Sequence, residues 1–78
     1  MKVQILGTGC VKCKALAANA EQAIVEAGVD AYVEKITDLQ EIMRFGVMMT
    51  PGLAIDGEVK STGKVLSSSE ISELLKGQ

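Results

Sequence analysis

The pattern of apolar and polar residues predicts strands and helices that alternate along the first half of the chain. Residues 3–6 form a short apolar run before a glycine-rich turn over 7–9, which predicts a buried strand. Apolar residues then recur at three- and four-residue steps and predict a helix from Cys10 to a cap at Gly28. Residues 29–36 mix β-branched and polar side chains, as in a second strand. The residues expected on the inward face of this helix are Cys13, Leu16, Ala17, Ala20, Ile24 and Ala27.

A shorter helix is predicted after the second strand. Asp38, followed three residues later by Glu41, is a capping-box pattern, and residues 45–46 suit the end of the helix. The residues expected to face inward from this helix are Leu39, Ile42 and Met43.

A hairpin is predicted next. Pro51 stands before a strand over 52–55, where its missing N–H is harmless. Asp56-Gly57 is a strong two-residue turn signal that leads into a strand over 58–61.

The chain ends on a third helix, which opens at a capping box formed by Ser67 and Glu70. Its apolar face is Ile71, Leu74 and Leu75. The order βαβαββα implies a right-handed crossover with a parallel pair at the front and an antiparallel edge from the hairpin. We therefore predict an α/β fold in which a four-stranded mixed sheet is flanked by three helices. With 78 residues, the chain 1–78 is expected to be a single domain.

The charge balance, the first residues and the cysteine count indicate which partners and which cellular location to expect. Eight Lys and Arg stand against ten Asp and Glu without a run of either sign, so we expect no binding to nucleic acid or to a membrane. The first residues lack the long apolar stretch of a signal peptide. A disulfide between two closely spaced cysteines would close only a short loop and would stabilise a secreted domain little. These features favour a cytoplasmic protein, and we expect it to be a monomer.

The candidate chemistry lies in the only two cysteines, Cys10 and Cys13, between the first strand and the first helix. Cys10 is expected to meet the unpaired N–H groups and the positive dipole of the first helical turn, which stabilise a thiolate. Lys12 and Lys14 add positive charge, and Gly7 and Gly9 let the backbone approach the sulfur.

The two thiols are expected to differ. Cys13, on the inward face of the helix, should be more buried and keep its proton. We therefore assign Cys10 as the thiolate that attacks a partner disulfide and Cys13 as the thiol that resolves the mixed disulfide.

The cysteine pair has other possible roles. It could merely brace the turn, or bind zinc, which would need further ligands because the chain has no His. The sharper alternative is Cu(I) carriage, since small copper-binding domains also place two cysteines at this spacing after a first strand. Those domains follow the order βαββαβ and end on a strand, which disfavours them here. Redox chemistry is therefore preferred, with no metal and no cofactor.

Cys10-Val11-Lys12-Cys13 after a first strand, with Thr50-Pro51 before a hairpin, resembles the thioredoxin superfamily. More narrowly, the whole chain looks like the small redox-active disulfide proteins of archaea and bacteria, which are minimal thioredoxin-like or glutaredoxin-like domains. The resemblance implies that Pro51 is a cis-proline beside the disulfide and that the backbone of Thr50 pairs with an extended partner segment. It further implies protein disulfides as substrates and a separate disulfide reductase as electron donor.

Some positions depart from that pattern or fit it weakly. Gln4 stands in the strand where thioredoxin has a buried carboxylate, so water, a lysine or a more distant acid is expected to take the resolving proton. Met48 and Met49 suit an adaptable apolar rim at the substrate-binding side of the site, but we expect at least one of them to pack in the core. Gly63, near a glutaredoxin-type glycine segment, is read as a turn glycine.

Overall fold

The computed structural model describes residues 1–9 and 11–77, and its elements follow the predicted order βαβαββα. They are β1 (Lys2–Leu6), α1 (Val11–Ala27), β2 (Tyr32–Ile36), α2 (Leu39–Arg44), β3 (Gly52–Ile55), β4 (Glu58–Thr62) and α3 (Ser68–Lys76).

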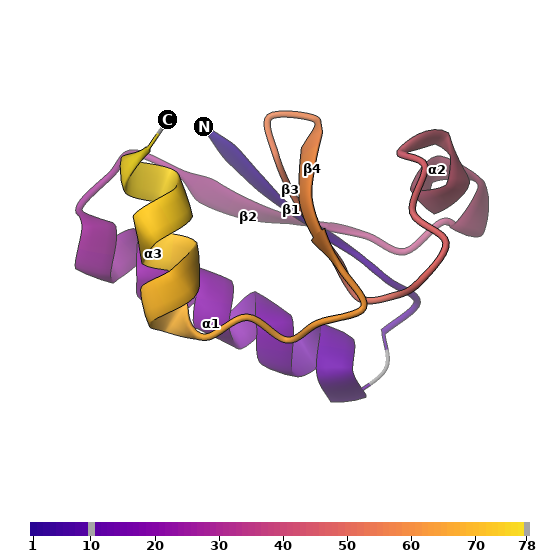
Figure 1. The fold of residues 1–78 in the computed structure, drawn as a ribbon, viewed down its shortest axis with the longest axis horizontal. Helices are drawn as coiled ribbons and strands as arrows, with labels where there is room; N and C mark the ends of the chain where they lie inside the picture. The colour runs from indigo at the N-terminus through magenta and orange to yellow at the C-terminus, as the bar shows by residue number, and fades with distance from the viewer. Residues whose placement is uncertain (10, 78) are drawn as a thin grey trace.

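One mixed sheet organises these elements (Figure 1). Within the described residues it has four strands in the order β2-β1-β3-β4. β1 runs parallel to β2 and antiparallel to β3, and β3 pairs antiparallel with β4. The predicted α/β class is confirmed, with a parallel pair at the front and the hairpin at one edge.

The second strand is shorter than predicted. It begins at Tyr32 rather than at residue 29 because its partner β1 begins at Lys2, which lies opposite Tyr32. Residues 29–31 therefore precede the ladder.

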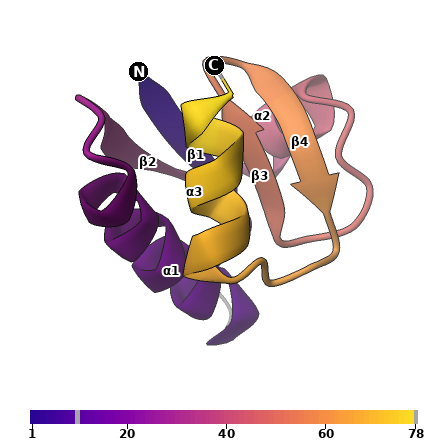
Figure 2. The same ribbon diagram turned by 60° about the vertical axis from the view of Figure 1, so that its left-hand side comes forward.

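The helices cover both faces of the sheet. α1 and α3 lie side by side on one face, whereas α2 lies on the other (Figures 1 and 2). The buried hydrophobic residues accordingly form two clusters, which lie on opposite faces of β1 and β3. The first consists of Val3, Ile5, Leu16, Ala17, Ala20, Ala23, Leu53, Ile55, Leu66, Ile71 and Leu75, and the second of Leu6, Ile42, Val47 and Ala54.

The inward face of α1 is close to the prediction. Cys13, Leu16, Ala17 and Ala20 are buried, as expected, and Ala23 joins them. The other two expected residues, Ile24 and Ala27, are partly buried against the same cluster. Gly28 follows the helix with φ of 66°, a left-handed conformation that suits a helix end.

α2 differs from the prediction in two respects. Asp38 is its N-cap, but the Asp38 side chain accepts from Gln40 N–H at 2.8 Å, and Glu41 pairs with Arg44 instead of completing a capping box. Ile42 is buried, whereas Leu39 and Met43 are mostly exposed.

The exposure of Leu39 and Met43 has a packing reason. α2 spans only six residues and reaches the sheet along one side, through Ile42. Val47, from the segment after the helix, fills the rest of the second cluster. The expectation that Leu39 and Met43 face inward was wrong: Ile42 is the α2 residue in the buried cluster, and Val47 joins it from the following segment.

The hairpin and the last helix follow their local signals. Asp56 and Gly57 both adopt positive φ, as the tight turn requires, and Asp56 also accepts a hydrogen bond from Lys2 N–H at 2.8 Å.

The predicted capping box of α3 is present: Ser67 Oγ accepts from Glu70 N–H, and Glu70 Oε1 accepts from Ser67 N–H.

Candidate functional site

Cys13 lies in the first turn of α1 and is almost completely buried, with 4% of its surface exposed. The prediction that it faces inward is therefore confirmed. Its sequence partner, Cys10, lies outside the described residues, so the geometry between the two sulfur atoms stays a prediction. What the structure describes is the surroundings of Cys13.

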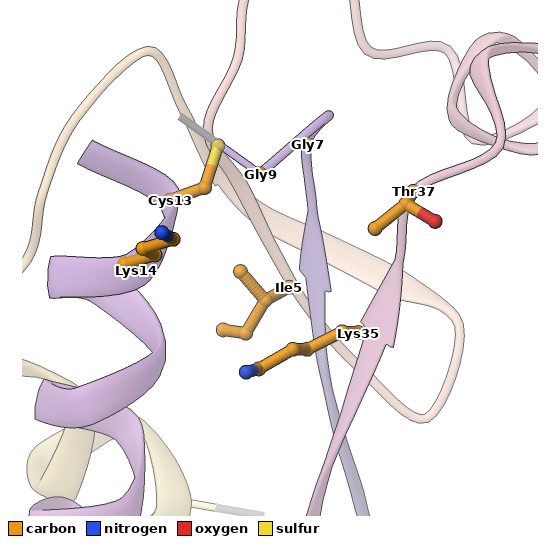
Figure 3. A pocket seen from close by; sticks show the side chains of 7 residues that line it. All are labelled: Ile5, Gly7, Gly9, Cys13, Lys14, Lys35 and Thr37. Carbon is orange, nitrogen blue, oxygen red and sulfur yellow. The ribbon is translucent and has the colours of Figure 1, made fainter. Parts of the chain in front are cut away.

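Three segments come together around Gly7, beside the Cys13 thiol. Gly7 follows β1 directly, and a Cβ placed on it would collide with Cys13 Sγ and would lie 3.9 Å from Pro51 Cα. Figure 3 shows the Cys13 side chain pointing to the turn that carries Gly7 and Gly9. The start of α1, through Cys13, and the residue before β3, Pro51, thus both lie close to Gly7 at the end of β1.

The peptide bond between Thr50 and Pro51 is cis, as the resemblance implied. Pro51 is buried, whereas Thr50 is exposed. The carbonyl oxygen of Pro51 accepts a hydrogen bond of 2.8 Å from Gly63 N–H, which extends the pairing between β3 and β4. Thr50 therefore stands at the surface, one residue before the proline that lies near the thiol.

A small pocket of about 90 Å³ opens beside Cys13. It is lined by Ile5, Gly7, Gly9, Cys13, Lys14, Lys35 and Thr37 (Figure 3). In the same view the Lys35 side chain extends from β2 past Ile5 toward the side of α1. Among the described residues, the charged and hydroxyl side chains of the lining are thus two lysines and a threonine, and no carboxylate is among them.

Gln4 takes no part in this pocket. Ile5 is the β1 residue that lines the pocket, and side chains alternate along a strand, so Gln4 belongs to the opposite face. There Gln4 Nε2 donates to Glu34 at 3.2 Å, and Gln4 Oε1 accepts from Gly57 N–H at 2.7 Å. The expected strand therefore offers the thiol a hydrophobic residue and no acid.

The sequence analysis placed Gly9 and Lys12 near the Cys10 thiolate, and their effect on that thiolate stays a prediction. Gly9 lines the pocket with φ of 92°, while Lys12 is exposed and does not line it. Lys35 and Thr37 were missed. The signal was available, because the predicted parallel pairing brings the end of the second strand beside the end of the first.

Both methionines before Pro51 are exposed, Met48 at 90% and Met49 at 65%. The expectation that at least one packs in the core was wrong, because Val47 already fills the second cluster. Met49 lies against the loop after β4: a Cβ on Gly63 would be 3.4 Å from Met49 Cβ and Cε. Gly63 itself has φ of 71°, as a turn glycine does.

The part of the chain that the structure describes has neither a cluster of metal ligands nor a membrane-spanning helix. Residues 1–9 and 11–77 contain no group of three or more His, Cys, Asp or Glu side chains placed to hold a metal ion. None of the helices in these same ranges is long and apolar enough to cross a membrane.

Comparison with known families agrees with this geometry. The model of the thioredoxin domain family matches residues 1–76. The chain belongs to the thioredoxin family. A protein named thioredoxin from Methanothermobacter thermautotrophicus is 48% identical over 75 residues, which cover 96% of this chain and 97% of that protein. A second protein of that name, from Methanocaldococcus jannaschii, is 43% identical over 74 residues, which cover 95% of this chain and 85% of that protein.

Proposed function

We propose that this member of the thioredoxin family is a thiol-disulfide oxidoreductase that reduces disulfides of partner proteins through Cys10 and Cys13. The observation that carries the proposal is the buried Cys13 thiol, in the first turn of α1 and beside Gly7 and Pro51. We also propose that residues 1–78 act as one domain and work as a cytoplasmic monomer.

The reaction transfers two electrons in two exchanges. The Cys10 thiolate attacks one sulfur of the partner disulfide, which forms a mixed disulfide and releases the other partner sulfur as a thiolate. Cys13 then loses its proton and attacks the Cys10 sulfur. The Cys10–Cys13 disulfide forms, and the second partner thiolate leaves. The partner is reduced, the chain is oxidised, and a separate disulfide reductase restores the dithiol without any cofactor bound here.

Unequal access to solvent supports this division of roles. A resolving thiol must not compete for the first attack, and burial keeps Cys13 away from an incoming disulfide. Its proton has an exit through the adjoining pocket, where Lys14, Lys35 and Thr37 are the polar lining groups. We propose that water in this pocket, assisted by the positive charge of the two lysines, takes the role for which thioredoxin uses a buried acid.

The partner segment is expected to lie along the residues before β3. Thr50 is exposed there and offers backbone groups to an extended chain, as the resemblance implied. Met48 and Met49 present flexible apolar side chains on the same segment. Such side chains adapt to varied partners, which suits a protein that reduces more than one substrate.

A reductase assay tests the proposal. The chain should accelerate the reduction of insulin disulfides by dithiothreitol, and Cys10→Ser should abolish the acceleration. Equal rates for the parent chain and Cys10→Ser would overturn the proposal. In that event, binding of one Cu(I) per chain, lost in both cysteine variants, would favour the metal carrier instead.

A further inference from the structure

Gly7 is the point at which the backbone after β1 approaches the buried thiol. A Cβ at this position would collide with Cys13 Sγ and would come within 3.3 Å of Cys13 Cβ. Gly7 is itself buried, so the collision would take place inside the protein and not at its surface. The sulfur of Cys13 occupies the space that any other residue at position 7 would fill.

The reason for glycine here is space and not backbone conformation. Gly9, Gly28, Gly46, Gly57 and Gly63 all have positive φ, which explains why they are glycines. Gly7 is not among them, so its backbone conformation is one that an alanine can adopt. A side chain at Gly7 is excluded by its neighbours, chiefly by one sulfur atom.

The backbone at Gly7 is also fixed in place. Its N–H donates a hydrogen bond of 3.0 Å to the carbonyl oxygen of Ile36, at the end of β2. The preceding residue, Leu6, is buried and paired with both Ile36 and Gly52 in the sheet. An added methyl group therefore cannot be relieved by moving Gly7 away from α1.

α1 is held just as firmly. Leu16 and Ala17, one turn beyond Cys13, are buried in the cluster on that face of the sheet. The side chain of Cys13 is the part that can rotate, so it is the part that must yield.

From this geometry we infer that Gly7 is a positioning residue: its missing side chain creates the slot that holds Cys13 Sγ where it can resolve the mixed disulfide. The role of Gly7 in resolving the mixed disulfide rests on the proposed function. The position of Cys13 Sγ in the slot can be tested independently of that function. Any side chain at position 7 expels the sulfur from the slot toward solvent.

Alkylation of Cys13 tests the slot directly. In the Cys10→Ser chain, Cys13 is the single thiol and should react slowly with iodoacetamide. Adding Gly7→Ala should accelerate the reaction by roughly tenfold or more, because exposure controls thiol reactivity. Gly28→Ala is the matched control: it strains a left-handed residue at the other end of α1 and lowers stability without touching the thiol. Equal acceleration by Gly7→Ala and Gly28→Ala would refute the inference, because loss of stability alone would then explain it.

A double-mutant cycle keeps the test decisive if Gly7→Ala folds poorly. Gly7→Ala should destabilise the parent chain strongly and the Cys13→Ala chain much less, since the colliding sulfur has been removed. The same destabilisation in both backgrounds would show that the sulfur is not what excludes a side chain.

Resolution of a mixed disulfide gives the functional readout. With both cysteines present, Gly7→Ala should prolong the life of the mixed disulfide by about tenfold, whereas Gly28→Ala should leave it unchanged. Unchanged resolution in a Gly7→Ala chain whose Cys13 is exposed would contradict the positioning role. If no mixed disulfide forms even with the parent chain, the proposed function fails, while the alkylation result still decides the slot.

Discussion

Gly57 donates its backbone N–H to the side-chain oxygen of Gln4 over 2.7 Å, so that a buried amide in β1 holds the turn of the hairpin. The other end of the same amide donates to Glu34 of β2. Gln4 therefore links three segments of the sheet on the face opposite the Cys13 pocket.

Replacing Gln4 by Leu should lower the free energy of unfolding without changing the rate at which the mixed disulfide is resolved. The change removes the hydrogen bond from Gly57 N–H, which is exposed and can bind water instead, and should lower the free energy of unfolding by about 0.5–1.5 kcal/mol. The resolution rate of the mixed disulfide should stay at the parent value, because Ile5 and not Gln4 lines the pocket. Denaturant unfolding and stopped-flow resolution measure the two quantities. A slower resolution step in Gln4→Leu would place Gln4 in the proton path and contradict this assignment.

Met48 is expected to contribute to the binding of protein substrates and not to the fold. Because it is 90% exposed, Met48→Ser should change the free energy of unfolding by no more than about 0.5 kcal/mol. It should raise KM for insulin several-fold, and reduction of a small aromatic disulfide should be unaffected. The matched control is Met43→Ser, an exposed methionine on α2, which should change neither. Equal effects of Met48→Ser and Met43→Ser on KM would argue against a rim at the site.

The two lysines of the pocket should assist the departure of the Cys13 proton. Lys14→Gln with Lys35→Gln should slow resolution by roughly two- to tenfold, because positive charge favours the thiolate that attacks. The effect should shrink in about 1 M salt, where the Debye length is near 3 Å. Lys2→Gln at the start of β1, combined with Lys76→Gln at the end of α3, removes the same number of charges away from the pocket and is the control for net charge. An effect of the lysine pair that persists undiminished in high salt would speak against an electrostatic role.

The capping box of α3 should make part of the stability depend on pH. The hydrogen bond from Ser67 N–H, and then that with the Ser67 hydroxyl, hold the pKa of Glu70 below its ordinary value of 4.5. A lowered folded-state pKa means that the contribution is fully present above about pH 4.5 and is lost as the pH falls through the folded-state pKa.

Unfolding measured against pH checks this expectation. Glu70→Gln should remove the acid-dependent part of the unfolding free energy in that window, and Ser67→Ala should weaken it. Parallel pH profiles for the parent chain and Glu70→Gln would contradict the expectation.

Sequence patterns predicted the parts of the fold that adjacent residues decide. The Asp56-Gly57 turn and the Ser67–Glu70 capping box depend on backbone groups within a few residues, and both form as predicted. The order of strands and helices follows from the same local signals together with the handedness of the crossover. The cis peptide bond before Pro51 was different: only the family resemblance implied it.

The sequence was a poor guide where a distant segment decides the outcome. The apolar spacing of Leu39 and Met43 suggests a buried face, but Ile42 is the α2 residue in the buried cluster, and Val47 joins it from the following segment. The approach of Gly7 to Cys13 was not foreseen, because Gly7 and Gly9 were expected to bring the backbone close to the Cys10 sulfur. Packing of α1 on the sheet places Cys13 Sγ beside Gly7, and residues distant in sequence decide that packing.

The central claim is that Cys10 and Cys13 have different roles, and trapping of the mixed disulfide tests it most directly. Each single Cys→Ser variant is incubated with an oxidised protein substrate, quenched with acid and separated without reductant. Cys13→Ser should accumulate a covalent complex with the substrate, because the buried thiol that would release it is gone, and Cys10→Ser should accumulate none. Equal trapping by the two variants, or trapping by Cys10→Ser alone, would contradict the account.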